Sequence, residues 1–140
     1  MSNQSRKYLI DSSVLIPYIR RNQAFVARLD ALSEKFISPT IVAELAFGAY
    51  RSHDPVDGMQ RVEAIVNLLP EVRINIGIRY NFAEMKNALV RANQLIPEND
   101  IWIAVTAIAY DLTLIARDAH FTRLTPYGLQ CQFQFMVSLI

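Results

Sequence analysis

This sequence has only one cysteine, almost no net charge and no long apolar run. Its single cysteine, Cys131, excludes a disulfide within the chain, and the amino-terminal segment does not resemble a signal peptide. These two features favour the reducing cytoplasm as the location of the protein. No apolar run reaches the roughly 18 residues that a membrane-spanning helix needs.

The net charge of +1 gives the protein no general attraction for nucleic acid. A nucleic-acid partner would therefore have to be bound by local patches or through metal ions. The chain has 140 residues, of which 52% are hydrophobic and 19% charged, and this is enough for one domain with a substantial core. Because the sequence contains no linker, repeat or low-complexity tract, we predict a single domain over residues 1–140.

Strand-like and helix-like segments alternate along the chain. The apolar pattern predicts strands at 7–11, 35–38, 71–75, 112–116 and 129–135. Helical spacing predicts helices from residue 13 to about 19, at 23–33, from residue 40, around 62–69, at 79–93 and at 100–110, with a helical turn at 119–123. The helix at 100–110 is apolar nearly all round and should be buried. Such an alternation favours a parallel sheet covered by helices on both faces.

Helix starts are expected where a small polar residue precedes the apolar periodicity. Ser12 or Ser13 is the predicted N-cap of the first helix, and Thr40 and Asn99 are predicted to cap two later helices.

One carboxylate stands between two apolar runs near the amino terminus. The residues at 8–10 are typical of a buried strand, and Asp11 ends that strand immediately before the next apolar run. A charge in such surroundings is costly unless it is paired or holds a metal ion. Ligands of α/β proteins bind at the carboxyl ends of parallel strands. Asp11 is therefore the first candidate for a functional residue.

Three further acids interrupt apolar sequence. Asp118 stands just beyond a predicted strand, and Glu44 and Asp100 lie in the first turns of predicted helices. In a parallel sheet with right-handed connections, these positions share one edge with Asp11. Carboxylates so close together repel one another unless they bind cations, and oxygen ligands suit Mg²⁺ or Mn²⁺. Such ions activate water and neutralise phosphate charge in phosphodiester cleavage.

Each acid also has a purely structural interpretation. Asp100 can be an acid that the helix dipole favours at a helix start, Glu44 can lie on a solvated helix face, and Asp118 can cap a turn. Neither His53 nor His120 has the spacing of a metal ligand, so surface or turn roles are favoured for both. Metal-dependent cleavage by carboxylates requires no catalytic histidine.

Three neighbours of the acids have open or secondary roles. Ser13 has two possible roles, as the N-cap of a helix or as a residue that hydrogen-bonds within the site. Arg117 stands beside the last acid and has two possible roles, as a contact for a phosphate or as a solvated surface residue. Trp102 is assigned to the core or to an interface in preference to a platform for base stacking.

The segments that contain the four acids resemble the four motifs of PIN-domain ribonucleases, and the nearest subgroup is the VapC-type toxins of prokaryotic toxin–antitoxin pairs. These segments are LIDSS at 9–13, TIVAELAFG at 40–48, NDIWIA at 99–104 and IARD at 115–118. Taken in order, they extend the resemblance over nearly the whole chain. One departure is Ala116, where many relatives have a threonine or serine, so that a possible hydrogen bond near the last acid is lost.

The resemblance implies a three-layer α/β/α sandwich with a central parallel sheet, and an endoribonuclease activity that depends on Mg²⁺ or Mn²⁺. By matching position, it implies catalytic and metal-binding roles for Asp11, Glu44, Asp100 and Asp118. Ser13 matches the hydroxyl or amide residue that follows the first acid. The resemblance further implies RNA as substrate, a homodimer, and a small antitoxin protein that blocks the site.

Two other functions fit parts of the sequence. A receiver-like signalling domain shares the size, the acidic strand end and Mg²⁺. That domain requires an aspartate after the third strand, where Asn75 and Ile76 stand, and a late lysine, whereas no lysine follows Lys86. The other alternative is a PIN-like domain without activity that serves in assembly, and the presence of all four acids argues against it. Metal-dependent cleavage of a mixed RNA would separate these functions.

Overall fold

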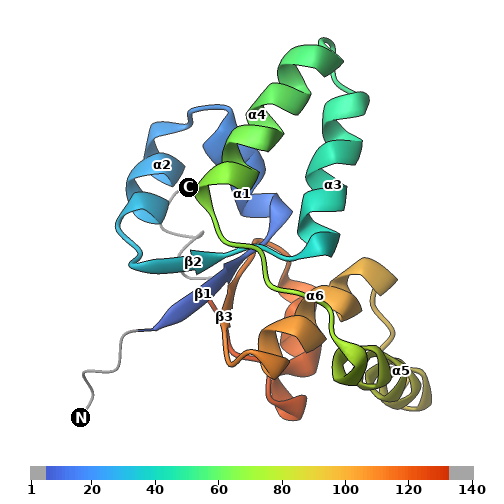
Figure 1. Cartoon of the computed structure of the whole chain (residues 1–140). Helices are drawn as coiled ribbons and strands as arrows, with labels where there is room; N and C mark the ends of the chain where they lie inside the picture. Colours follow the sequence, from blue (N-terminus) through green and yellow to red (C-terminus); the bar gives the residue numbers. More distant parts are fainter. Residues whose placement is uncertain (1–5, 133–140) are drawn as a thin grey trace.

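A four-stranded parallel sheet lies at the centre of the computed structural model, which describes residues 6–132 (Figure 1). The strands are β1 (Lys7–Ile10), β2 (Glu34–Phe36), β3 (Thr113–Ile115) and β4 (Cys131–Gln132). They are hydrogen-bonded in the order β2-β1-β3-β4, and every pairing is parallel. The predicted α/β fold with a central parallel sheet is confirmed.

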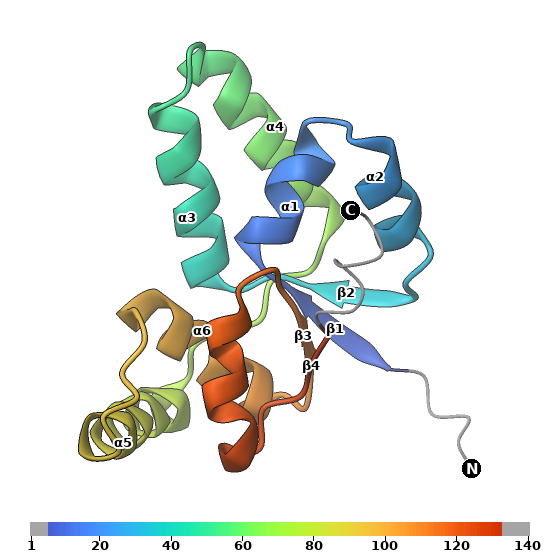
Figure 2. The same ribbon diagram turned by 180° about the vertical axis from the view of Figure 1, so that it is seen from behind.

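Helices connect the strands and cover both faces of the sheet. They are α1 (Ser12–Ile19), α2 (Gln23–Asp30), α3 (Pro39–Tyr50), α4 (Pro55–Leu68), α5 (Ile76–Arg91), α6 (Glu98–Ala109) and the 3₁₀ helix η1 (Ala119–Tyr127). Figures 1 and 2 show α1 and α2 on one side of the sheet and α5, α6 and η1 on the other. In the same views α3 and α4 form an antiparallel hairpin that projects away from the sheet.

The two central strands carry the most deeply buried part of the core. Leu9 and Ile10 on β1, and Leu114 and Ile115 on β3, have no exposed surface. Burying an aliphatic side chain of this size contributes roughly 1.5–3 kcal/mol to the stability of a fold. α6 is buried on most sides, as its apolar sequence predicted. This core fixes the strand ends at which the acidic residues lie.

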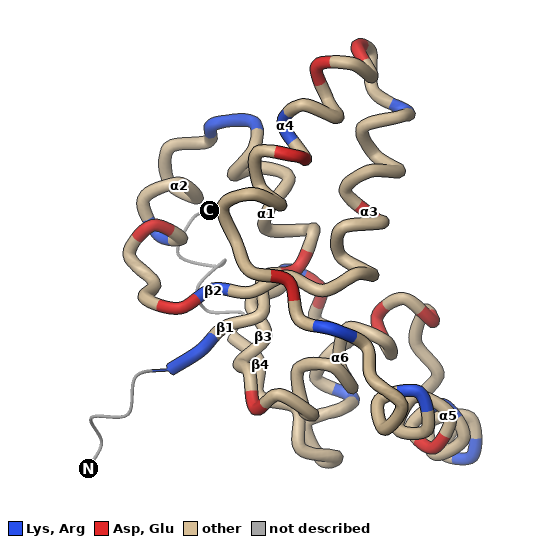
Figure 3. The backbone as a smooth tube through the Cα atoms, viewed as in Figure 1, with Lys and Arg blue, Asp and Glu red and all other residues tan. Residues whose placement is uncertain are grey.

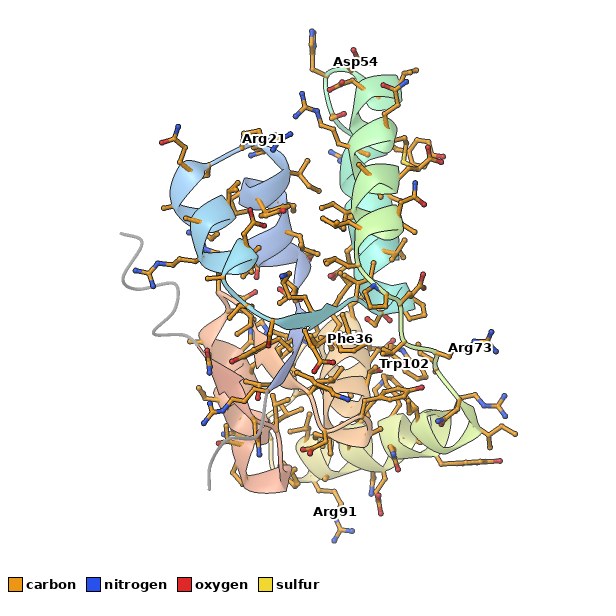
Figure 4. The ribbon with its side chains drawn as sticks, turned by 60° about the vertical axis from the view of Figure 1, so that its left-hand side comes forward. Arg21, Phe36, Asp54, Arg73, Arg91 and Trp102 are labelled. Carbon is orange, nitrogen blue, oxygen red and sulfur yellow. The ribbon has the colours of Figure 1, made fainter. Side chains whose placement is uncertain are left out.

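Trp102 belongs to the packing between two helices. It lies on α6 (Figure 4). Its ring stacks against Phe82 of α5, with ring centroids 4.0 Å apart and an interplanar angle of 12°. Both rings are partly buried against the hydrophobic core. The packing confirms the core role expected for Trp102.

The segment at 71–75, which the sequence predicted to be a strand, forms a single bridge to the sheet edge. Ile37 and Glu71 make that bridge, with Val72 N donating to Ile37 O at 2.9 Å. The chain then leaves the edge because Asn75 caps α5, its side-chain oxygen accepting from Ile78 N at 2.9 Å. A local helix cap thus replaces the expected pairing. Of the strand predicted at 129–135, β4 covers residues 131–132, and residues 133–135 lie outside the described residues.

None of the three predicted helix N-caps is the observed one: a neighbouring residue caps α1 and α3, and α6 has no side-chain cap. Ser38, and not Thr40, caps α3, because Pro39 occupies the first turn, where its missing N–H costs nothing. Asp11, and neither of the two serines after it, caps α1 through the hydrogen bond that its carboxylate accepts from Ser13 N. The first candidate for a functional residue is thereby tied to the start of a helix.

Candidate active site

Asp11 lies between the end of β1 and the start of α1. Its backbone N–H donates to Ile115 O on β3 at 2.9 Å, and its side chain is only 4% exposed. The Oδ2 atom accepts two hydrogen bonds from Ser13, one from the backbone N–H at 3.1 Å and one from Oγ at 2.5 Å. The carboxylate is therefore held rigidly at the carboxyl end of a central strand.

Ser13 joins two segments that are distant in sequence. While its hydroxyl donates to Asp11, the same oxygen accepts a hydrogen bond from Arg117 N at 3.1 Å. This contact ties the start of α1 to the segment between β3 and η1. Of the two roles left open for Ser13, the structure shows the hydrogen-bonding one, since the cap is Asp11.

Glu44 faces the same region from the first half of α3. Its Oε1 atom accepts from Ser12 Oγ at 2.8 Å, and its Oε2 atom accepts from Asn99 Nδ2 at 3.3 Å. The side chain of Asn99 makes this contact instead of the predicted cap, and α6 begins after Pro97 without a side-chain cap. Donors from α1 and α6 thus fix both oxygens of Glu44, which argues against a freely solvated position.

Asp100 and Asp118 meet His120 in the same region. Asp100 lies in the first turn of α6, Asp118 precedes η1, and His120 lies in the first turn of η1. The Nε2 atom of His120 is 2.6 Å from Asp100 Oδ2. One potential ligand atom from each of the three residues lies within 4.8 Å of the other two. The acidic positions on α3 and at the start of α6 can be followed in Figure 3.

All four predicted acids line one cleft of about 490 Å³. Ser12, Ser13, Asn99 and His120 are among its other lining residues. The expected convergence of four carboxylates from separate segments is therefore present in the fold. Arg117 lies outside this cleft, in an exposed position with its guanidinium carbon 5.5 Å from the centre of the Phe25 ring.

Burial and mutual repulsion raise the pKa values of two of these acids. Burial, reinforced by the negative charges of Glu44 and Asp100, raises the pKa of Asp11 to about 6, although the Ser13 hydrogen bonds oppose the change. Burial likewise raises the pKa of Asp100 above its ordinary value, with Glu44 and Asp118 adding to the effect and His120 opposing it. The cluster therefore carries an electrostatic cost that a bound cation would relieve.

One buried atom in the cleft lacks a partner. Within residues 6–132, Asp11 Oδ1 is the buried side-chain oxygen or nitrogen for which no hydrogen bond is found. A buried carboxylate oxygen without a partner costs about 1–3 kcal/mol or more. A divalent cation would satisfy this oxygen and the neighbouring carboxylates together. The donor set around the cleft therefore fits a divalent metal ion.

Three residues of the cleft were not found by sequence reasoning as parts of a site. Asn99 was assigned to a helix cap and His120 to a surface or turn role, whereas both side chains contact an acid of the cleft. Ser12 was expected only as an alternative N-cap, yet it holds Glu44. A signal did exist for His120, because it follows Asp118 by two positions at a strand end that already carried an acid.

The sequence and the fold are both similar to those of known proteins. The family model for the PIN domain matches residues 8–125. Ribonuclease VapC2 from Haemophilus influenzae is 29% identical over 114 residues, which cover 80% of this chain and 86% of that protein. The structure of VapBC-1 from nontypeable Haemophilus influenzae superposes with a TM-score of 0.76 at 26% identity, over 89% of this chain and 96% of that one. VapBC-5 from Mycobacterium tuberculosis, a member of the VapBC family of toxin–antitoxin systems, gives a TM-score of 0.70 at 19% identity, over 90% and 95%.

Proposed function

The chain belongs to the PIN-domain family, and from this premise we propose that it is a metal-dependent endoribonuclease that acts as the toxin of a toxin–antitoxin pair. The observation that carries the proposal is the meeting of four carboxylates around the unpartnered Oδ1 atom of Asp11. Membership of the family removes the receiver-like alternative. The retained carboxylates favour an active enzyme over an assembly module.

Asp11, Glu44, Asp100 and Asp118 are the residues that would hold Mg²⁺ or Mn²⁺ in the cleft. When bound, such an ion lowers the pKa of a coordinated water and neutralises charge on the phosphate that is attacked. The protein supports this chemistry by holding the acids in place before the substrate arrives. Ser13 fixes Asp11 by two hydrogen bonds, and Ser12 and Asn99 together fix Glu44.

The path of the RNA strand is proposed to leave the acidic cleft beside Arg117. A hollow of about 640 Å³ adjoins the cleft, and Ser13 and Asp118 line both. Arg20 and Arg117 also line the hollow, and within the described part of the chain neither forms an ion pair with a carboxylate. Because the net charge of the protein is only +1, a local pair of cations is the means by which it would hold a phosphate backbone.

We also propose a small antitoxin protein as partner and a homodimer as the active form. VapBC-5, one of the structural neighbours, is a member of a family of toxin–antitoxin systems, and this supports the partner. Several large apolar side chains are exposed on the helices, which supports an interface between copies: Phe47, Tyr50, Val56, Ile76 and Tyr80. Light scattering should then give about twice the chain mass of 16.0 kDa.

The cytoplasmic location stays a prediction. Over residues 6–132, the structure contains no helix that is both long enough and apolar enough to cross a membrane.

Incubation of the purified protein with a mixed RNA tests the proposed activity. Cleavage should occur with millimolar Mg²⁺ or Mn²⁺ and stop when excess chelator is added, because the ion held by the carboxylates is proposed to lower the pKa of the attacking water. The products should include internal fragments, as expected of an endonuclease. Cleavage at an unchanged rate in excess chelator would refute the metal-dependent mechanism.

A further inference from the structure

We propose that His120 is a direct ligand of the metal ion in the cleft, and that its imidazole makes this site favour Mn²⁺ over Mg²⁺. The inference rests on the proposed function only in requiring that the cleft binds a divalent ion. It replaces the all-oxygen ligand set expected from the sequence with one that includes a nitrogen.

The geometry of the three-residue cluster of Asp100, Asp118 and His120 carries the proposal. His120 Nε2 lies 2.6 Å from Asp100 Oδ2, and one ligand atom from each of the three residues lies within 4.8 Å of the others. Ligand atoms bound to a common ion at about 2.2 Å can be at most about 4.4 Å apart. The widest pair of the cluster would have to close by a few tenths of an ångström to surround one ion. His120 Nε2 and Asp100 Oδ2 would have to part from 2.6 Å to about 3 Å, and the hydrogen between them would be lost to solvent when the ion binds.

A second observation indicates that a cation belongs in this cleft. Asp11 Oδ1 is buried, with the residue 4% exposed, and has no hydrogen-bond partner within the described residues. Asp11 and His120 line the same cleft as Asp100 and Asp118. Asp11 is not among the three residues whose ligand atoms lie within 4.8 Å of one another. Its unpartnered oxygen supports a cation in this cleft, and the three-residue cluster marks where His120 would bind it.

The imidazole of His120 is held in a defined position. Its side chain is 25% exposed, and its ring packs against Phe121 with centroids 5.2 Å apart. Within residues 6–132, the one side chain that contacts its Nε2 atom is Asp100. A fixed nitrogen beside two carboxylates presents the mixed ligands that first-row transition metals accept, whereas Mg²⁺ prefers oxygen and retains water.

A purely orienting role makes a different prediction. If His120 only held Asp100 by a hydrogen bond, removing the imidazole would lower the affinities for Mn²⁺ and for Mg²⁺ to a similar extent. A direct nitrogen ligand should instead matter for Mn²⁺ and hardly for Mg²⁺. The ratio of the two affinities therefore distinguishes a ligand from a positioning residue.

The test measures binding of Mn²⁺ and Mg²⁺ to the full chain, prepared without a histidine tag, as wild type, His120→Ala and His53→Ala. His53 is the matched control, because it is the only other histidine of the sequence and is exposed between α3 and α4. We expect His120→Ala to lower Mn²⁺ affinity at least about tenfold and Mg²⁺ affinity less than about threefold. His53→Ala should leave both affinities unchanged.

Pulsed electron paramagnetic resonance of bound Mn²⁺ provides a readout that does not depend on whether the His120→Ala variant folds. Wild type and His53→Ala should show the nitrogen coupling of a directly bound imidazole, and His120→Ala should lack it. Mn²⁺ bound to the wild type without that coupling, or an equal loss of both affinities in His120→Ala, would overturn the proposal and leave the proposed function standing. Failure of the wild type to bind either ion would overturn both.

Discussion

The hydroxyl of Ser13 donates to Oδ2 of Asp11 at 2.5 Å while it accepts a hydrogen bond from the backbone of Arg117. This one side chain therefore sets the orientation of the most buried acid and links it to the strand end that carries Asp118. A carboxylate held in this way keeps its other oxygen, Oδ1, available for a cation. Removing the Ser13 hydroxyl should therefore disturb the position of Asp11.

Ser13→Ala should reduce RNA cleavage roughly 10- to 100-fold, because hydrogen bonds that orient a metal ligand are typically worth this much. The cost in stability should be about 1–3 kcal/mol, because the hydroxyl makes two hydrogen bonds, one to Asp11 and one from Arg117 N. Ser52→Ala serves as control, because it removes a serine hydroxyl just beyond α3 whose one hydrogen bond, within residues 6–132, is to Ala49 O at the end of that helix. Cleavage rates and urea unfolding of the two variants check this, and comparable activity in both would argue against the supporting role of Ser13.

The pKa of Asp11 predicts how the stability of the metal-free protein depends on pH. The folded-state pKa is about 6 and the ordinary value is 3.8, so the folded protein binds this proton more tightly than the unfolded chain does. The contribution of Asp11 to the free energy of unfolding is therefore fully present below about pH 4 and is lost as the pH rises toward 6. The loss should be roughly 3 kcal/mol, since each pH unit in this range contributes about 1.4 kcal/mol.

Asp11→Asn cannot ionise and should lack this decrease. Urea unfolding in chelator between pH 4 and pH 7.5 measures the free energy of unfolding of both proteins, and the other titrating groups contribute similarly to each. The difference between the two curves isolates Asp11. Parallel curves would mean that Asp11 ionises in the folded state as easily as in the unfolded chain.

Asp100 offers a test of metal binding that does not require activity. A ligand that binds only the folded state stabilises it by about 2.7 kcal/mol at a hundredfold excess over Kd. Burial, together with repulsion from Glu44 and Asp118, outweighs the favourable contact with His120 and disfavours the charge of Asp100. Asp100→Asn should therefore be at least as stable as the wild type in chelator. Loss of an acid from the first turn of α6 opposes this by about 0.3–1 kcal/mol.

Thermal unfolding of wild type and Asp100→Asn, each with chelator and with millimolar Mg²⁺, separates these effects. The wild type should gain clearly from Mg²⁺, and the variant should lose most of that gain. If both proteins gain the same stability, Asp100 is only an acid at a helix start and not a ligand.

Arg117→Ala is expected to weaken RNA binding more than it slows catalysis. The guanidinium lines the hollow beside the cleft, so its loss should raise KM several-fold while kcat changes little. Removing it also ends the contact with the Phe25 ring, worth about 0.5–1 kcal/mol at an exposed site. Arg73, exposed and labelled in Figure 4, provides the control variant Arg73→Ala. Steady-state kinetics in which both variants match the wild type would remove Arg117 from the substrate path.

The fold and the acids of the cleft could be predicted because they leave strong local signals. Leu9 and Ile10 form a fully buried strand end, and a charge directly after them at Asp11 had to be compensated. Positions at strand ends and helix starts then followed from the parallel topology. The segment at 71–75 has the composition of a strand, but pairing at a sheet edge depends on a neighbour that the sequence does not specify.

The supporting residues could not be predicted in the same way. Asn99 and Ser12 are polar residues at helix starts, where capping is the commonest role, and only the packing of α3 against α1 and α6 brings Glu44 within their reach. The role of His120 could not be predicted because it depends on the turn after β3, which directs the imidazole ring toward Asp100. Contacts between side chains from different elements require the three-dimensional arrangement, which a single sequence provides only through resemblance.

The central claim is that the cleft around Asp11 cleaves RNA by means of a bound metal ion, and one comparison of variants tests it most directly. Asp11→Asn preserves the shape of the residue and removes its charge. Asp54→Asn makes the same chemical change at the cap of α4, where asparagine caps equally well. Circular dichroism should show that both variants are folded.

The measurement is the rate at which wild type and the two variants cleave a labelled single-stranded RNA in millimolar Mg²⁺ or Mn²⁺. Asp54→Asn should stay within about twofold of the wild type, and Asp11→Asn should lose activity by at least about a hundredfold. Equal rates for folded Asp11→Asn and wild type would contradict the assignment of this cleft as the active site.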